Sequence, residues 1–438
     1  MDKIKVVWIC HFSNQQIRNK IPLSKRYFVN FLRRLLSKRS ANYFDFAPWV
    51  TNLIREFEKL DNVELHVIAP HDGLTRLTYE FEMNGISYHI FKPSGKSILS
   101  RFFKKILKEN NPQYKMNRKI VKQFIKTIQP VIVNLIGSEN PYYSITTLDI
   151  KNIPVYISAQ TVYTNPDRLK YSGAVDKHRW DIELKIHQKE LYYGCGGRMH
   201  RDLILNNNPE AVIFKFFFPI QKPSNIEKDV EKIFDFVFFA AQVTNKKGIE
   251  DALEALALVK KQYGNVTLNV VGKCAPDYKI HLLNIMQKTG IEDSVSFNDY
   301  FPLITDMHEH IKKARFALLP LKLDVISSAL IEAILLDLPV VTYKTSGTPY
   351  LNKDGDTVLL AEIGDIEKLA DNMLKLLNSP ELADKLRRDA KAFVGNEFDN
   401  KASAKRLVSN YKAVINHYHQ NIPIPEKQLF NTDEFPLY

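Results

Sequence analysis

Short apolar stretches alternate along this chain with segments in which apolar residues recur every three or four positions. The short stretches predict strands, and the periodic segments predict amphipathic helices such as Trp49 to Leu60. In the first half the predicted strands are Lys5 to His11, Val63 to Ala69, Ser87 to Phe91, Val131 to Ile136 and Pro154 to Ala159. Strands that alternate with helices favour a parallel, doubly wound sheet.

The same alternation starts again after the polar stretch QKPSNIEKDVEK. Its predicted strands are Phe234 to Ala241, Thr267 to Val271, Ser294 to Phe297, Phe316 to Leu319 and Pro339 to Tyr343. The predicted helices between them are Ile249 to Gln262, Lys279 to Thr289, Met307 to Ala314 and Ser327 to Leu336. Three further helices, Ile366 to Asn378, Pro380 to Glu397 and Lys401 to His419, precede a Pro-rich tail whose aromatic residues suggest that it docks on the protein.

The pattern therefore predicts an α/β protein with two doubly wound, Rossmann-like domains that face each other across a cleft. Pro219 and Pro223 interrupt the pattern between the two runs. We expect an N-terminal domain over residues 1–220 and a C-terminal domain over 221–405. Residues 406–438 are expected to form a terminal helix and tail that pack back toward the N-terminal domain.

Composition agrees with a protein that builds two cores. The chain has 438 residues, 45% of them apolar, and its apolar runs are too short to cross a bilayer. The N-terminus reads as a strand, and the three cysteines are too few and too far apart for a disulfide framework. These features predict a cytoplasmic protein.

The net charge of +12 is concentrated in the N-terminal part. The first 130 residues hold 24 Lys and Arg against 10 Asp and Glu, which leaves the remaining 308 residues at about −2. Most of the excess lies in two blocks, Arg18 to Arg39 and Arg101 to Lys126, where basic residues are mixed with aromatic and aliphatic ones. Such blocks suit contact with anionic lipid at the inner membrane face or with an anionic acceptor. A solvated basic face is the simpler alternative, and nucleic-acid binding is not expected.

The segment Leu321 to Tyr343 carries the strongest chemical signal. Ser327 and Ser328 open a helix whose free N–H groups and positive dipole end suit a phosphate. Asp324 and Glu332 are eight positions apart, a little over two helical turns, so they could bind two hydroxyl-bearing parts of one extended ligand. A nucleotide sugar is such a ligand.

A second loop supports a phosphate site. Lys247 and Gly248 lie between a predicted strand and a predicted helix, where Lys247 would face a diphosphate and Gly248 would allow a tight turn. Asp354-Gly355-Asp356 resembles a metal-binding Asp-x-Asp pair, but Asp and Gly are ordinary turn residues, so no metal site is expected there.

These blocks, in this order, resemble the family 4 glycosyltransferases, retaining enzymes with the two-domain GT-B fold. The resemblance covers most of Phe234 to His417 and rests on FFAAQVTNKKGIEDALEALALVKKQYGNVTLNVVG, VSFNDYFPLITDMHEHIKKARFALLP, DVISSALIEAILLDLPVVTYKTSGTP and KDGDTVLLAEIGDIEKLADNMLKLL. It implies an acceptor-binding N-terminal domain and a donor-binding C-terminal domain.

By this resemblance, Glu332 binds the nucleotide ribose, Asp324 binds the donor sugar, and the backbone from Ser327 to Ala329, with Ser328, binds the diphosphate. Lys247 and Gly248 belong to the diphosphate loop. Gln242 takes the place of a clamp arginine, and Val325 and Ser327 take the places of glycines. Gln160 stands where a histidine is common and would orient the sugar or acceptor. Tyr300 belongs to the loop expected to select the base. The segment CGGRMHRDLI resembles a subset from surface-polysaccharide pathways.

The implied activity is metal-independent transfer of a hexose, with retention, from a nucleoside diphosphate sugar to a saccharide or lipid-linked acceptor in capsule, exopolysaccharide or lipopolysaccharide synthesis. The donor is a substrate, and no cofactor is expected. Alternatives are another GT-B enzyme, such as a sugar-nucleotide epimerase or a phosphorylase, and a non-catalytic partner subunit, which Gln242, Val325 and Gln160 motivate.

Overall fold

The computed structural model describes residues 3–25, 43, 45–94, 113–166, 175–220, 222–223, 230–299, 301, 303–322 and 326–435. The chain divides into two compact units. Unit 1 comprises Met1–Cys195, His200–Pro219 and Asn400–Phe430, and unit 2 comprises Gly196–Met199, Ile220–Asp399 and Asn431–Tyr438. In the described part of the chain, no helix is long and apolar enough to cross a membrane.

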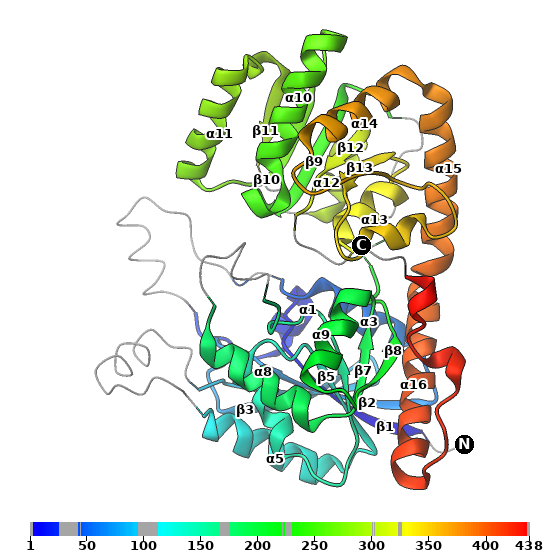
Figure 1. Cartoon of the computed structure of the whole chain (residues 1–438). Coiled ribbons are helices and arrows are strands. Elements are labelled where there is room, and N and C mark those ends of the chain that lie inside the picture. The colour runs from blue at the N-terminus through cyan, green and yellow to red at the C-terminus, as the bar shows by residue number, and fades with distance from the viewer. Residues whose placement is uncertain are drawn as a thin grey trace. The chain divides into compact units, whose positions relative to one another are not determined.

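Unit 1 is built on an eight-stranded sheet, as far as its residues are described, in the order β3-β4-β2-β1-β5-β6-β7-β8 (Figure 1). The strands are β1 (Ile4–Cys10), β2 (Val63–Pro70), β3 (Thr78–Met83), β4 (Ile86–Phe91), β5 (Ile132–Ile136), β6 (Val155–Ser158), β7 (Tyr192–Cys195) and β8 (Val212–Lys215). Among these described strands only β3 pairs antiparallel, at the edge beside β4. Strand order reverses between β1 and β5, the position where open parallel sheets leave a crevice at their carboxyl ends.

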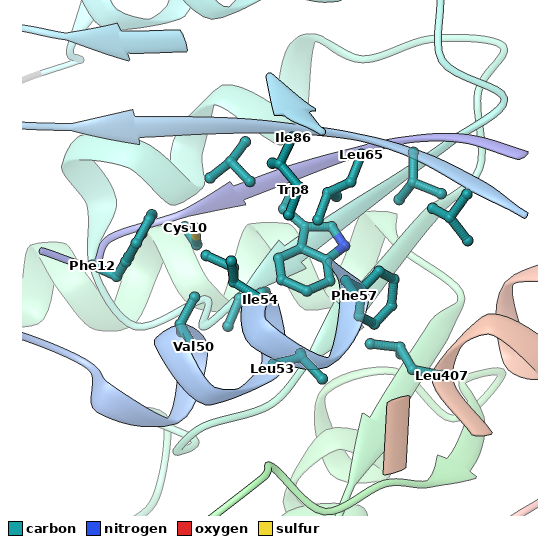
Figure 2. Packing of buried hydrophobic residues seen from close by; sticks show 14 of the residues in the cluster. Trp8, Cys10, Phe12, Val50, Leu53, Ile54, Phe57, Leu65, Ile86 and Leu407 are labelled. Carbon is teal, nitrogen blue, oxygen red and sulfur yellow. The ribbon is translucent and has the colours of Figure 1, made fainter. Parts of the chain in front are cut away.

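Helix α3 (Pro48–Phe57) packs its apolar stripe against this sheet (Figure 2). Val50, Leu53, Ile54 and Phe57 follow helical spacing and are buried together with Trp8 of β1. The rings of Trp8 and Phe57 meet edge to face, with centroids 4.7 Å apart. Each fully buried apolar side chain of this kind contributes about 1.5–3 kcal/mol, so this stripe fixes the helix on the sheet.

The other helical elements of unit 1 lie between the strands or follow unit 2 in the chain. They are α1 (Gln15–Lys20), α5 (Lys115–Ile128), α6 (Pro141–Ser144), η1 (Ile145–Asp149), α8 (Lys177–Lys189), α9 (Arg198–Asn207) and α16 (Asn400–Gln420). Helix α16 is part of the core of unit 1. Its Tyr411 hydroxyl accepts a hydrogen bond from Asn134 of β5 at 2.6 Å, and Asn410 donates to Tyr156 of β6 at 3.2 Å.

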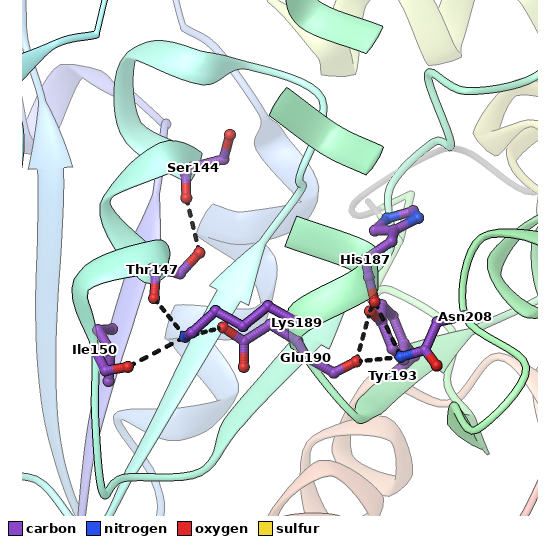
Figure 3. Close-up of polar contacts among 8 residues, drawn as sticks. All are labelled: Ser144, Thr147, Ile150, His187, Lys189, Glu190, Tyr193 and Asn208. Carbon is purple, nitrogen blue, oxygen red and sulfur yellow. Dashed lines mark hydrogen bonds and ion pairs between the residues drawn. The ribbon is translucent and has the colours of Figure 1, made fainter. Parts of the chain in front are cut away.

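Side chains satisfy the carboxyl end of α8 (Figure 3). Tyr193 and Asn208 each donate to the carbonyl oxygens of His187 and Glu190, at 2.8–3.0 Å. Lys189 donates to two carbonyl oxygens around η1 and pairs with Glu190 at 2.6 Å. Carbonyls at the end of a helix need such partners, so this network fixes α8 beneath the loops after β5 and β6.

Unit 2 has a six-stranded, fully parallel sheet among its described residues, in the order β11-β10-β9-β12-β13-β14. The strands are β9 (Phe234–Gln242), β10 (Leu268–Lys273), β11 (Val295–Asn298), β12 (Ala314–Leu319), β13 (Val340–Tyr343) and β14 (Leu359–Ala361). This is the 3-2-1-4-5-6 order of a Rossmann sheet, with the reversal between β9 and β12.

The helical elements of unit 2 are η2 (Asn245–Lys247), α10 (Ile249–Tyr263), α11 (Pro276–Thr289), η3 (Glu292–Ser294), α12 (Ile304–Ile311), α13 (Ser328–Leu335), η4 (Thr348–Asn352), α14 (Ile366–Asn378) and α15 (Pro380–Glu397). Two short turns, η5 (Glu426–Gln428) and η6 (Thr432–Glu434), lie in the tail. Phe430 donates its N–H to the Ile213 carbonyl in unit 1, and Phe435 stacks on Tyr350 in unit 2, with ring centroids 4.3 Å apart.

Candidate functional site

The predicted phosphate-binding loops come together in unit 2, where strand order reverses. The loop from Val243 to Gly248 follows β9, and the segment from Pro320 to Ser327 follows β12. Because β9 and β12 are parallel neighbours, their carboxyl ends share one edge of the sheet. This places four predicted residues, Gln242, Lys247, Gly248 and Ser328, at or just beyond that edge.

Gly248 is required by the backbone at this junction. Its φ of 79° is unfavourable for residues with a side chain, and an added Cβ would lie 1.8 Å from the carbonyl oxygen of Pro320. Lys322 donates its N–H to the Lys246 carbonyl at 3.2 Å, so the two loops are also joined by a backbone hydrogen bond. The glycine therefore permits the close approach that builds this edge.

A buried carboxylate anchors the second loop on helix α10. Asp251, in the first turn of α10, pairs with the Lys322 ammonium at 2.5 Å and accepts a hydrogen bond from the Tyr343 hydroxyl at 2.7 Å. This hydrogen bond, together with burial and the nearby carboxylate charge, raises the pKa of Tyr343, and burial is the largest cause. Asp251 thus links α10, β13 and the segment after β12.

Gln242 ends β9 and is exposed, and Lys247 is half-buried in η2. Gln242 is paired in register with Lys273 of β10. Both line a cavity of about 220 Å³, whose other lining residues are Val243, Thr244, Ala275 and Tyr278. Lys273 places a cation beside the position where the family resemblance led us to expect an arginine, and the sequence pattern did not single it out.

Helix α13 begins at Ser328, with Ser327 as its N-cap in extended conformation. Ser327 is buried and Ser328 is exposed. The N–H groups of Ser328 and Ala329 precede the first hydrogen bond of the helix, which Leu330 donates to the Ser327 carbonyl at 3.1 Å. Asp324 and Tyr300 lie outside the described residues. Helix α13 begins at Ser328, so its helical rise applies from that residue onward.

Glu332 lies inside α13 and is buried, not on the helix surface. Its Oε2 is 3.3 Å from Nε2 of His308, a residue of α12 that is itself 1% exposed. The sequence pattern did not single out His308. Its partner lies 24 positions further along the chain, and only the packing of α12 beside α13 brings them together.

In unit 1, two residues lie just beyond the carboxyl ends of the central strands. Gln160 is two positions beyond β6 and half-buried, and His11 directly follows β1. The His11 ring hydrogen-bonds the Tyr142 hydroxyl and packs on Phe46, whose side chain is 45% exposed, with ring centroids 4.4 Å apart. Burial raises the pKa of Tyr142, so its hydroxyl stays protonated. The sequence pattern did not single out His11 or Tyr142.

A polar network supports the loop after β5 from below. Ser138 donates to Glu183 Oε1 at 2.8 Å and lies 3.2 Å from His187 Nε2, while Glu183 Oε2 accepts the Thr164 N–H at 2.7 Å. Burial raises the pKa of Glu183 and lowers that of His187 to about 3. Although this is a Ser, His and Glu cluster, each side chain is at most 1% exposed, so it holds loops and is closed to substrate.

The two basic blocks fall partly outside the described residues, which include only residues 18–25 and 113–126 of them. Within the described part, no group of three or more His, Cys, Asp or Glu could hold a metal ion.

Comparison with known proteins shows a family match in the second half of the chain. Residues 222–393 match the family model of the glycosyl transferases group 1. The amylovoran biosynthesis glycosyltransferase AmsK of Erwinia amylovora is 28% identical over 177 residues, 39% of this chain and 43% of that protein. The capsular polysaccharide biosynthesis glycosyltransferase CapM of Staphylococcus aureus is 21% identical over 177 residues, 40% of this chain and 46% of the relative. The match thus spans less than half the length of these relatives.

Likeness in structure extends further along the chain. The Anabaena protein HepE, solved in complex with UDP and glucose, matches with a TM-score of 0.61 at 14% identity and covers 93% of this chain and 99% of its own. At this identity the likeness shows the fold alone. The fold is therefore that of the GT-B glycosyltransferases, with two Rossmann-like domains, as the sequence predicted.

Proposed function

We propose that this protein is a retaining glycosyltransferase that moves a hexose from a nucleoside diphosphate sugar to a saccharide or lipid-linked acceptor in surface-polysaccharide synthesis. One observation supports donor binding by unit 2. The loops after β9 and β12 meet where the strand order reverses, inside the stretch that matches the group 1 family. The names of the amylovoran and capsule relatives, and the UDP and glucose bound to the Anabaena neighbour, support the pathway and the donor class.

In this proposal the diphosphate binds at the start of α13 and beside Lys247. The N–H groups of Ser328 and Ala329 and the helix dipole face the anion, and Lys247 adds a full charge. Glu332 hydrogen-bonds the ribose and Asp324 the donor sugar. Negative charge develops on the leaving diphosphate, so preorganised positive groups lower the barrier most. We propose that they do so without a metal, so that chelation by EDTA leaves the rate unchanged.

Gln160 cannot act as a base, because its amide does not take up a proton near neutral pH. We assign it to orientation of the sugar or acceptor by hydrogen bonds. The acceptor's proton then passes to a phosphate oxygen of the donor, with retention of the anomeric configuration.

Calorimetry with a panel of nucleotide sugars tests the donor half. Wild type should bind one of them, and Glu332→Ala should weaken binding by about 100-fold or more, since two hydrogen bonds to a charged group are lost. Glu254→Ala, which changes an exposed acid of helix α10 in the same unit, is the matched control and should bind as wild type does. Absence of binding to every nucleotide sugar would refute the proposal.

Product analysis by NMR tests the reaction. A glycoside with the donor's anomeric configuration is expected in the presence of acceptor. An epimerised nucleotide sugar would instead identify a sugar-nucleotide epimerase, and donor binding without turnover, even with membranes present, would identify a non-catalytic partner subunit.

We also propose that unit 1 contacts an anionic membrane surface through a basic groove on helix α5. Lys119, Lys122, Lys126 and Lys151 are exposed and line a groove of about 890 Å³. The carboxylate in the groove, Asp149, is held by Arg118 at 2.6 Å, and this hydrogen bond lowers its pKa. The charge of the four lysines therefore remains available to a phosphate-bearing surface.

Vesicle co-sedimentation tests this contact. Each lysine near an anionic surface contributes about 1 kcal/mol, so changing all four to Gln should weaken binding to phosphatidylglycerol vesicles by several hundredfold, on the order of fivefold for each lysine. Replacing four exposed lysines of unit 2, Lys261, Lys288, Lys368 and Lys375, changes the net charge equally and serves as control. Equal losses in both variants would refute a specific contact.

A further inference from the structure

We infer that His308 is a positioning residue that aims Glu332 at the nucleotide ribose. The two side chains come from α12 and α13, the helices on either side of β12 in the chain, and meet at 3.3 Å between Nε2 and Oε2. His308 is 1% exposed and the Glu332 side chain 11%. The inference rests on the proposed function, in which Glu332 binds the ribose, and assigns a role to a residue outside that site.

Burial determines what the Glu332 carboxylate needs. A carboxylate removed from water needs donors for its oxygens, because an unpaired one costs several kcal/mol. The Nε2–H of His308 supplies one such donor and fixes the carboxylate by one oxygen, Oε2. A carboxylate held in one orientation loses less conformational entropy when ribose hydroxyls bind to its other oxygen.

His308 is too deeply buried to touch a ligand, so its effect must pass through Glu332. That requirement gives a distinctive signature. Loss of His308 should matter for a nucleotide that offers ribose hydroxyls to Glu332 and should not matter for one that lacks them. If His308 only packed α12 against α13, its loss would weaken the binding of both nucleotides equally.

The experiment compares two ligands across three variants by calorimetry. The ligands are the ribonucleoside diphosphate that wild type binds best and its 2′,3′-dideoxy analogue. His308→Leu removes the donor, and His308→Gln restores an N–H at a similar distance from the backbone. His310→Leu is the matched control. His310 lies two positions further along α12, and this variant removes a similar hydrogen bond, between His310 Nε2 and Asn269 Oδ1 at 3.0 Å.

We expect His308→Leu to weaken the binding of the ribonucleotide about tenfold or more and that of the dideoxy analogue less than about twofold. His308→Gln should recover most of the loss, and His310→Leu should leave the ratio of the two affinities at its wild-type value. In a Glu332→Ala background, His308→Leu should change neither affinity. Equal weakening of both ligands by His308→Leu would overturn the inference.

A measurement on wild type covers the case in which a variant does not fold. Nitrogen NMR of the imidazole rings should show His308 with its proton on Nε2, and the signal should shift when the ribonucleotide binds but not when the dideoxy analogue binds. A proton on Nδ1 alone would overturn the inference and leave the proposed function intact. Wild type that binds no nucleotide would instead refute the proposed function, and this inference with it.

Discussion

Gly248 provides a stringent test of how the candidate donor site is built. Its φ of 79° and the Pro320 carbonyl oxygen, 1.8 Å from where a Cβ would lie, penalise any side chain in two independent ways. A left-handed conformation costs a residue with a Cβ about 1–2 kcal/mol. The steric overlap adds about 1–3 kcal/mol, since the surrounding backbone must shift. Gly248→Ala should therefore destabilise unit 2 by about 2–5 kcal/mol.

Gly290 separates the two contributions. It also lies in unit 2, at the end of α11, with a φ of 70°, but nothing lies within 4 Å of its added Cβ. Gly290→Ala should therefore show the conformational cost alone, about 1–2 kcal/mol. The difference between the two variants, about 1–3 kcal/mol, measures the close approach of the loops after β9 and β12.

The assay must report on unit 2. All three tryptophans, Trp8, Trp49 and Trp180, belong to unit 1, so their fluorescence follows the unfolding of that unit. Urea denaturation monitored by far-UV circular dichroism follows both units, and hydrogen exchange of peptides from β9 and α10 reports on the junction itself. If the two variants lose the same stability within about 0.5 kcal/mol, the close approach at Pro320 is refuted.

Three further outcomes are expected. Burial holds the pKa of His187 at about 3, below its ordinary 6.5, so between these pH values the unfolded chain binds a proton that the native chain does not. The free energy of unfolding should therefore fall as the pH drops below 6.5, by about 2 kcal/mol at pH 5. His187→Gln should lack this pH dependence in denaturation monitored by fluorescence. Tyr411→Phe removes the acceptor of the buried Asn134 amide and should destabilise unit 1 by about 1–3 kcal/mol, whereas Tyr418→Phe, on an exposed ring of the same helix, should be neutral. Phe435→Ala removes the ring stacked on Tyr350, so limited proteolysis should cleave the tail faster, and an unchanged cleavage rate would refute docking there.

Apolar patterns were sufficient to predict most of the fold. The five strands predicted in each half are present, and the long helices such as α14 and α15 have the predicted bounds. Strand β3 was missed because its TYEFEM sequence alternates and lies half exposed at an antiparallel edge. Strands β7, β8 and β14 were also missed, and each is only three or four residues long.

The candidate site was harder to predict because its contacts join elements that are distant in sequence. Loop chemistry indicated Lys247, Gly248 and the start of α13, but the need for glycine at 248 comes from Pro320 in another loop. The burial of Glu332 against His308 joins two helices, and the pattern of neither helix alone indicates it. Asp324 and Tyr300, outside the described residues, stay predictions, as does the role of Gln160.

The contact between β5 and α16 bears on how this chain is made. Asn134 and Tyr411 are 277 residues apart, and Leu407 and Val414 of α16 belong to the same core as Trp8. On the ribosome, most of unit 1 therefore emerges before unit 2 but lacks part of its core until α16 is synthesised. Unit 2, encoded almost entirely between, has its sheet complete by then. During synthesis, unit 1 would thus stay incomplete until unit 2 has been made, and its exposed apolar core would bind chaperones.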